Sequence, residues 1–322
     1  MYLTFDIRAT SILYSFLQKN KGNGIWIIPV NVCHLVPACF IKAECPFEIV
    51  DVDKLKLDLD ENQVIQKLIE YPRKYSGILS VRNYGDDYSK ESFFKKIRKH
   101  EPDIKIIDDA CLSYPDISTP LSSLVDLELY STGYSKPLDL GFGGFGKLHP
   151  QKNQLKPMNL NFEKESLKEM NNYYVYLTKK FIKAEHNRFK TSWLNSENVN
   201  SSEYLNQISL NFEKTKKHKN KINKIYDNLL KLNLKERRLS TNWRYNIKLL
   251  NPDLVLDKIF ENGLFASQHY FPLNRVFDSN LCPNWENAFK SILNLFNDKR
   301  FTTEQAEKCC EIVNKYAKAI NN

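Results

Sequence analysis

Glycine is scarce in this sequence, which contains 10 glycines among 322 residues, against the roughly 7% of a typical soluble protein. Five of the ten nevertheless lie between Gly133 and Gly146, in the stretch STGYSKPLDLGFGGFG that also contains Lys136. Glycine is needed where the backbone turns with positive φ or passes close to another group. The clustering therefore marks a specialised loop, and Lys136 is its first candidate for a functional side chain.

Long apolar runs and paired cysteines are also missing. No run of about 18 apolar residues occurs, so no transmembrane helix and no membrane insertion are predicted. The N-terminus MYLTFDIRATSILYSF lacks a basic start and an uninterrupted apolar stretch, which argues against a secretory signal. The seven cysteines are an odd count without a CxxC pair. We therefore expect reduced thiols and a cytoplasmic location.

Positive charge is in excess, with a formal net charge of +9, and lysines are densest in residues 211–238. Apolar residues around this segment recur at helical spacing: Ile208, Phe212, Ile222, Ile225, Tyr226, Leu229 and Leu230. The pattern predicts a long amphipathic helix with a solvated basic face. A phosphate-attracting surface is the alternative, and a nucleic-acid binder ranks last among the functions considered.

The first half of the chain alternates between helical and strand patterns. Helices are predicted at about residues 8–20, 34–42, 60–71 and 89–100, the last with Ser89 as its N-cap. Strands are predicted at 25–30, 47–53, 77–81, 104–110 and 126–131. This alternation is typical of an α/β fold in which helices cover both faces of a mostly parallel sheet.

The second half becomes polar and rich in asparagine from about residue 150. It predicts long helices at 163–190 and 202–235, a strand at 242–250, and helices near 253–263 and 303–320. We expect a large domain over residues 1–200 and a smaller C-terminal α+β domain over residues 201–322, entered by the long helix.

In parallel sheets, ligands bind at the carboxyl ends of the strands. That rule selects Asp108 and Asp109, the segment from Ser131 to Lys136, and the segment from Pro29 to His34. The two aspartates can be a solvated strand end or an N-cap, or they can bind a metal or a protonated nitrogen. Further Asp, Glu or His at short spacing are absent, so no metal site is predicted.

The hexapeptide GFGGFG formally satisfies the dinucleotide pattern GxGxxG. It is followed by KLHPQKN, which has no helical pattern, so the required strand–turn–helix context is missing. The glycines instead predict a turn where the backbone passes close to a bulky group. Lys136 precedes them by five residues, and a lysine forms an imine with a carbonyl when its pKa is lowered. The ordinary alternative is a solvated surface charge.

The segments IIDDAC and DLELYSTGYSKPLDLGFGG together resemble the signature of the DegT/DnrJ/EryC1/StrS family, the sugar aminotransferases that use pyridoxal phosphate. Other segments resemble this family in the same order: ATSIL at 9–13, IIPVNVCHLVPACFIKAECPFEIVDVD at 27–53, VRNYGDD at 81–87, and two C-terminal segments at 263–274 and 292–316. The resemblance covers most of the chain and is strongest over 104–144. It implies the pyridoxal-phosphate transferase fold of type I.

The resemblance implies a role for five residues. Lys136 matches the lysine that binds the cofactor covalently and acts as general base for a 1,3-proton shift. Asp109 matches the aspartate that pairs with the pyridine nitrogen and keeps it protonated. Ser131 matches the serine that binds the phosphate. Thr10 and Ser11 match the phosphate loop at a helix N-terminus, where the helix dipole favours an anion.

The sequence departs from the family pattern at several positions. Where the family stacks an aromatic residue or histidine on the cofactor, this chain has Cys33 and His34, with Cys33 in the better register. Leu112 stands where the family often has glutamine, and Ala9 stands at the glycine of the phosphate loop. These changes leave attachment of the cofactor expected, and they leave the substrate open.

Family members are usually homodimers in which an Asn and an Arg from the neighbouring subunit reach the active site. The weak match here is NVNSSE, with Asn198 at the Asn position and Asn200 where Arg would be. A homodimer with Asn198 near the cofactor is therefore the expectation from the resemblance. The sequence also begins only a few residues before the phosphate loop, so the usual N-terminal helical segment is expected to be missing or short.

The resemblance thus implies an aminotransferase that moves an amino group, from glutamate, to a keto group of a nucleotide-linked sugar. Such enzymes serve surface polysaccharide, lipopolysaccharide and related biosynthesis. A sister activity, a sugar dehydratase, has histidine in place of the lysine, and Lys136 argues against it. The alternative is a repurposed or non-catalytic protein of the same fold with an altered substrate.

Overall fold

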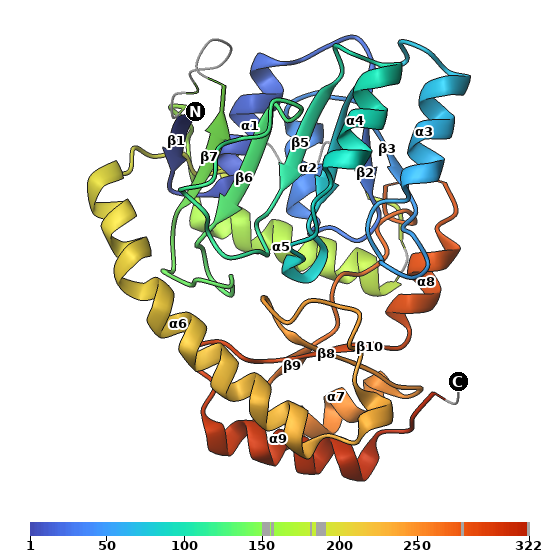
Figure 1. Ribbon diagram of the computed structural model, residues 1–322, viewed down its shortest axis with the longest axis vertical. Helices are drawn as coiled ribbons and strands as arrows, with labels where there is room; N and C mark the ends of the chain where they lie inside the picture. The colour runs from blue at the N-terminus through green and yellow to red at the C-terminus, as the bar shows by residue number, and fades with distance from the viewer. Residues whose placement is uncertain (150–154, 156–157, 181, 185–190, 278–279, 321–322) are drawn as a thin grey trace.

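The computed structural model describes the whole chain except residues 150–154, 156–157, 181, 185–190, 278–279 and 321–322. A large sheet with helices on both faces lies beside a smaller sheet (Figure 1). Strands β5 and β6 of the large sheet run toward the smaller one, so the carboxyl ends of these strands face it. This arrangement places the candidate site between the two sheets.

The large sheet has seven strands in the order β1-β7-β6-β5-β4-β2-β3. Their bounds are β1 Tyr2–Asp6, β2 Ile25–Pro29, β3 Phe47–Val50, β4 Tyr75–Val81, β5 Lys105–Asp109, β6 Leu127–Ser131 and β7 Gly144–Leu148. Strands β2 to β6 pair in parallel, whereas β7 pairs antiparallel with both β6 and β1. All five predicted strands are present, and the predicted α/β fold class is confirmed.

Two strands of this sheet, β1 and β7, were not predicted from the sequence. Strand β7 reads GFGKL, which has the composition of a turn. It forms a strand because its backbone pairs with β6 on one side and β1 on the other, so the ladder satisfies its polar groups. The interpretation of the whole glycine cluster as a turn is therefore wrong for residues 144–146.

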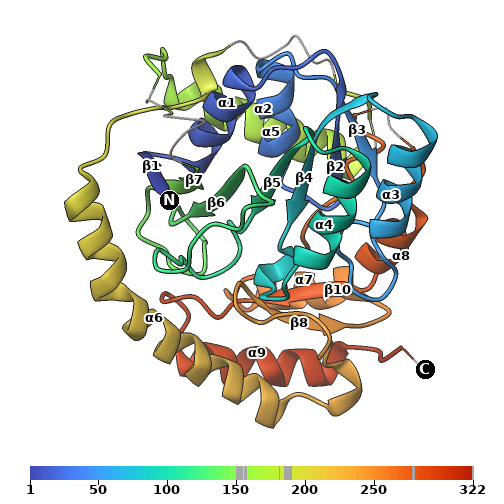
Figure 2. The ribbon, with the colours of Figure 1, turned by 45° about the horizontal axis from the view of Figure 1, so that its top comes forward.

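Helices cover both faces of the large sheet (Figure 2). One face carries α1 Ala9–Lys19, α2 Leu35–Lys42 and α5 Lys164–Lys180, and the other carries α3 Glu61–Glu70 and α4 Glu91–His100. Alternate residues of a strand belong to separate hydrophobic cores on the two faces of the sheet, because successive side chains of a strand point to opposite faces. Ile28 and Ile107 pack in the core with α1, whereas Ile27 and Ile106 pack in the core with α3 and α4.

The predicted N-cap of α4 is wrong. Lys90 occupies the cap position and makes no side-chain cap bond, while Ser89 Oγ accepts a 3.4 Å hydrogen bond from the amide of Glu91. Helix α3 is capped by Asp60, whose carboxylate accepts hydrogen bonds from two amides of the first turn.

The smaller sheet is antiparallel in the order β8-β10-β9, with β8 Tyr245–Lys248, β9 Ala266–Ser267 and β10 Ile292–Leu295. The helices that pack on it are α6 Ser201–Leu229, α7 Pro252–Glu261 and α9 Thr303–Tyr316, whereas α8 Pro283–Phe289 buries Trp285 and Phe289 in the core of the large sheet. Elsewhere in the chain, short 3-10 turns lie at η1 Asn83–Gly85, η2 Thr191–Trp193 and η3 Leu232–Leu234. We call residues 201–320 the C-terminal unit. The predicted domain boundary at residue 200 stays a prediction.

Helix α6 confirms the predicted amphipathic segment. It runs from the edge of the large sheet along α9 (Figures 1 and 2). Its buried side includes Ile208, Ile222 and Tyr226, and its exposed side carries lysines. It ends at Leu229, six residues before the predicted end, because Leu230 has an extended backbone with ψ 142°.

Three further predictions concern helix α5, the cysteines and membrane helices. Helix α5 ends at Lys180, and residues 185–190 of its predicted range lie outside the described part of the chain. All seven cysteines are free thiols, as predicted. Within the described residues, no helix combines the length and the apolar character needed to cross a membrane.

Candidate active site

A cavity of about 410 Å³ lies at the carboxyl ends of β4, β5 and β6. The last residues of these strands, Val81, Asp109 and Ser131, all line it. So do Cys33 from the β2–α2 connection and Lys136 from the loop after β6. Its volume falls in the range of about 300–1,000 Å³ that is usual for small-molecule sites. All three strand ends selected from the sequence thus contribute to one cavity.

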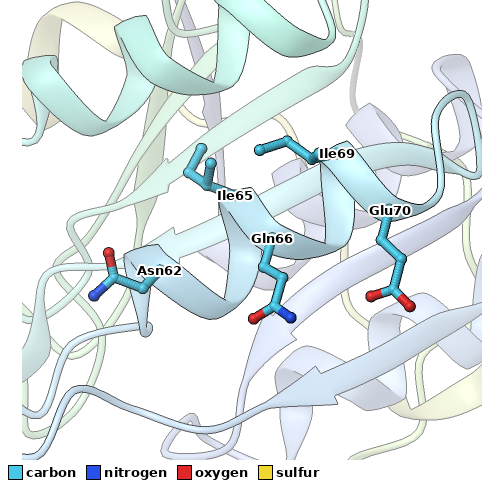
Figure 3. Close-up of a pocket in the computed structure, with 5 residues that line it drawn as sticks. All are labelled: Asn62, Ile65, Gln66, Ile69 and Glu70. Carbon is cyan, nitrogen blue, oxygen red and sulfur yellow. The ribbon is translucent and has the colours of Figure 1, made fainter.

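A second hollow, of about 530 Å³, has a different character (Figure 3). Its five lining residues are Asn62, Ile65, Gln66, Ile69 and Glu70, and all five come from α3. Ile69 is largely exposed there. Because side chains from one helix cannot converge on a ligand from several directions, we place the candidate site in the 410 Å³ cavity.

Asp109 is the buried acid of the cavity, with 6% of its surface exposed. Its Oδ1 accepts a 2.9 Å hydrogen bond from the amide of Cys111. Burial raises the pKa of this carboxyl group, and the hydrogen bonds from Cys111 and the positive charge of Lys136 partly offset that rise. A cationic partner inside the cavity would therefore stabilise the charged form of Asp109.

The neighbouring Asp108 serves a different purpose, because strand alternation turns it to the opposite face of the sheet. It accepts a 2.8 Å hydrogen bond from Arg82 Nη2. Arg82 also pairs with Glu128, which in turn pairs with the fully buried Lys147 at 2.9 Å. Of the two aspartates of IIDDA, Asp108 thus belongs to a network of ion pairs and Asp109 lines the cavity.

The glycine cluster brings the loop of Lys136 against its neighbours. A Cβ atom on Gly143, which has φ 93°, would lie 2.5 Å from the Tyr204 ring. A Cβ atom on Gly144 would lie 2.5 Å from the backbone nitrogen of Ala9, the first residue of α1. The predicted close approach is confirmed at both glycines, and it is what lets the lysine loop and α1 share one cavity.

The N-terminus of α1 forms one end of the cavity. Thr10 lines the cavity, and Ser131 Oγ, which also lines it, accepts a 3.3 Å hydrogen bond from the amide of Gly133. The first-turn amides of a helix lack intrahelical partners and carry partial positive charge, which favours an anion. The predicted phosphate contact of Ser11 is not brought to the cavity: Ser11 is fully buried, does not line the cavity, and its hydroxyl donates to the carbonyl of Asn195.

Arg8 was missed by the sequence analysis. It is the N-cap residue of α1 and lines the cavity beside Thr10. Its guanidinium lies 6.0 Å from the centre of the Phe162 ring, and burial lowers its pKa. The sequence signal was a cation directly before the phosphate-loop segment ATSIL.

The structure separates Cys33 from His34. Cys33 lines the cavity, and burial raises the pKa of its thiol. The His34 ring stacks on Tyr174 at a centroid distance of 5.4 Å, and its Nε2 lies 2.9 Å from Asn171 Oδ1. The side chain of His34 therefore packs against α5, and it does not line the cavity.

Asn198 is also not brought to the cavity of its own chain. It is exposed in the segment before α6, whereas Asn195 lines the cavity. Asn200 is the N-cap of α6 and accepts a 3.2 Å hydrogen bond from the amide of Glu203. The expected role of Asn198 in a neighbouring subunit's site stays a prediction.

The C-terminal unit supplies an aromatic wall that the sequence analysis did not identify. Trp243 and Tyr270 line the cavity and stack at a centroid distance of 5.9 Å with an interplanar angle of 13°. His269 lines it as well, and its backbone carbonyl accepts a 2.7 Å hydrogen bond from Tyr84. The only sequence signal was that HYFPLN at 269–274 resembled the C-terminal region of the family.

Comparisons with known proteins agree at the level of the fold. No family model and no curated protein matches the sequence. A DegT DnrJ EryC1 StrS aminotransferase from Brucella abortus superposes with a TM-score of 0.69 at 17% identity, over 98% of this chain and 86% of that chain. For PseC of Helicobacter pylori the TM-score is 0.67 at 15% identity, with 98% and 86% covered. For DesI it is 0.72 at 13% identity, with 98% and 80% covered.

These similarities establish that the chain has the fold of the pyridoxal-phosphate-dependent sugar aminotransferases of known structure. At this level of identity a shared fold does not carry a shared activity. The function is therefore argued from the side chains that line the cavity.

Proposed function

We propose that this protein binds pyridoxal phosphate and is an aminotransferase that moves an amino group from glutamate to a keto group of a nucleotide-linked sugar. The observation that carries the proposal is the convergence of Lys136, the buried Asp109 and the N-terminus of α1 on one cavity. An amine, an acid and an anion site match the aldehyde, the pyridine nitrogen and the phosphate of this cofactor.

The donor set of the cavity fits the cofactor. Lys136 would bind its aldehyde carbon covalently, and Asp109 would face its pyridine nitrogen. Thr10, Ser131 and Arg8 would bind its phosphate, and Cys33 would lie along the ring. When bound, pyridoxal phosphate supplies a conjugated ring that withdraws electrons from the reacting carbon of the substrate.

The chain's own residues then have defined tasks. Asp109 stabilises a proton on the atom that it faces, because a buried carboxylate favours a nearby cation. The Nζ atom of Lys136 would accept a proton from the reacting carbon of the substrate and deliver it two atoms away, a 1,3-proton shift by general acid–base catalysis. Trp243 and Tyr270 exclude water from one side of the cavity and offer flat surfaces to a substrate.

The substrate class is supported by chemistry and by the structural neighbours. PseC is described as an aminotransferase involved in the biosynthesis of pseudoaminic acid, and DesI was solved with its TDP-sugar product. The net charge of +9 suits a substrate that carries a diphosphate. We extend the proposal to a cytoplasmic homodimer that serves surface polysaccharide or lipopolysaccharide synthesis.

A second candidate is a repurposed protein of the same fold that keeps the cofactor without transferring amino groups to sugars. Leu112 favours it, because this buried leucine lines the cavity where the family often has glutamine. An apolar side chain there donates no hydrogen bond to a polar atom of the cofactor.

The first experiment is reconstitution with pyridoxal phosphate. We expect yellow protein whose colour is lost on borohydride reduction, which would leave the label on Lys136. After borohydride treatment and removal of free cofactor, Lys136→Ala should carry no covalent label, whereas the control Lys95→Ala, which removes an exposed lysine paired with Glu91 on α4, should carry it. Colourless wild-type protein at saturating cofactor would refute the proposal.

The second experiment is incubation of the yellow protein with glutamate and a panel of nucleotide-linked keto-sugars, followed by mass spectrometry. Bleaching by glutamate and a sugar product with an added amino group are the expected results. Yellow protein that no amino donor bleaches would refute the aminotransferase and would favour the repurposed protein.

A further inference from the structure

Ser135, the residue directly before Lys136, has a left-handed backbone with φ 61°. Residues other than glycine rarely adopt this conformation, and it persists where surrounding contacts enforce it. Both backbone polar groups of Ser135 bind side chains: its amide donates to Asp139 Oδ2 at 2.7 Å, and its carbonyl accepts from Trp243 Nε1 at 2.8 Å. The backbone that leads into Lys136 is thus held from two sides.

Asp139 is the centre of this arrangement. Only 5% of its surface is exposed, and its Oδ1 accepts a 2.9 Å hydrogen bond from the amide of Gly141. Arg300 Nη1 donates to Oδ2 at 2.9 Å, and Lys299 Nζ donates to the Asp139 backbone carbonyl at 2.7 Å. One carboxylate therefore joins both ends of the lysine loop to Arg300, and Lys299 holds the backbone of the same residue.

The anchors come from the C-terminal unit. Trp243 lies just before β8 and Arg300 lies between β10 and α9, whereas Lys136 belongs to a loop of the large sheet. Building on the proposed function, we propose that Asp139, Trp243 and Arg300 are positioning residues that hold Lys136 in reach of the cofactor's aldehyde. The C-terminal unit thereby sets the geometry of the lysine as well as one wall of the cavity.

The alternative is that these contacts only join the two sheets. Asn242, the neighbour of Trp243, separates the two explanations, because its Nδ2 donates to the Gly85 carbonyl at 2.8 Å and to Asp87 at 2.9 Å. Those bonds also connect the C-terminal unit to the large sheet, and they do not touch the lysine loop. Asn242→Ala is therefore a matched control.

The test compares two forms of the cofactor on the full-length protein. Pyridoxal phosphate forms a bond to a lysine, whereas pyridoxamine phosphate has no aldehyde and reports only on the cavity. In Asp139→Asn and Arg300→Gln, neither of which changes a residue that lines the cavity, we expect the affinity for pyridoxal phosphate to fall by about tenfold, as for a lost hydrogen bond to a charged group. The affinity for pyridoxamine phosphate should stay within about twofold of wild type, and Asn242→Ala should change neither.

Equal loss of both affinities in Asp139→Asn and Arg300→Gln, or no loss of either, would overturn the positioning role. Thermal unfolding of each variant identifies a folding defect, and Arg300→Gln tests the role if Asp139→Asn does not fold. Wild-type protein that binds neither compound would instead refute the proposed function, and this inference with it. The two failures are thus distinguishable in one experiment.

Discussion

Replacing Gly144 by alanine is the sharpest test of the glycine cluster. The new Cβ atom would lie 2.5 Å from the nitrogen and 2.6 Å from the Cα of Ala9, where ordinary contact is 3.4–4 Å. Since both are backbone atoms, the start of α1 must move by roughly an ångström, and overpacking of this kind costs about 1–3 kcal/mol. The same shift moves the helix end that would bind phosphate, so we expect about tenfold weaker pyridoxal phosphate binding.

Gly263→Ala is the matched control for this change. Gly263 has φ 69°, and an added Cβ atom would meet nothing within 4 Å, so alanine there costs only conformational energy, which is about 1–2 kcal/mol. Urea unfolding should show a similar loss of stability in both variants, and cofactor titration should show weaker binding in Gly144→Ala alone. Equal cofactor affinity in the two variants would refute the assignment of α1 to the phosphate.

The remaining predictions concern single charged groups. Asp6 is buried, and burial raises its pKa to about 6 despite hydrogen bonds from Ser196 and Glu197. The folded state therefore binds the proton more tightly than the unfolded state, and stability falls as the pH rises from about 4 to about 6. Asp6→Asn should raise the free energy of unfolding by about 1–3 kcal/mol at pH 8 and leave it unchanged near pH 4, and equal effects in urea titrations at both pH values would contradict this. Asp109→Asn should still turn yellow with pyridoxal phosphate, but its transamination rate should be about 10²–10³-fold lower, because the negative charge beside the ring nitrogen is lost. An unchanged rate would contradict the role proposed for Asp109. Arg8→Ala should weaken pyridoxal phosphate binding and should not change binding of pyridoxal, which has no phosphate; equal weakening of both compounds would contradict a phosphate contact.

Local patterns in the sequence determined much of the large sheet. Strands such as β2 and β5 are short apolar runs between polar turns, and such runs are buried in parallel sheets whatever the details of packing. The rule that ligands bind at carboxyl ends of strands then selected Asp109 and the loop of Lys136 before any contact was known. The glycines at 143 and 144 marked close approach because few other residues permit it.

Some structural features could not be predicted from the local sequence pattern. Strand β7 has the composition of a turn, and it is a strand only because β1 and β6 flank it. The sequence pattern also left Cys33 and His34 as joint candidates for the cofactor face. The structure separated them, because His34 packs against Tyr174 and Asn171 of α5, a helix far later in the chain. Packing partners that lie far apart in sequence leave no periodic signal.

The sequence by itself determined the alternation of helices and strands, the acid at the end of β5, and the lysine beside its glycines, since each depends on residues within one short segment. Only the tertiary structure decided which residues surround that lysine. Trp243 and Arg300 reach the loop of Lys136 because the C-terminal unit packs against the carboxyl ends of the large sheet, and Arg8 reaches it from the start of α1 through a backbone bridge to Gly143. Contacts between units depend on how whole elements pack, and that packing is a property of the complete fold.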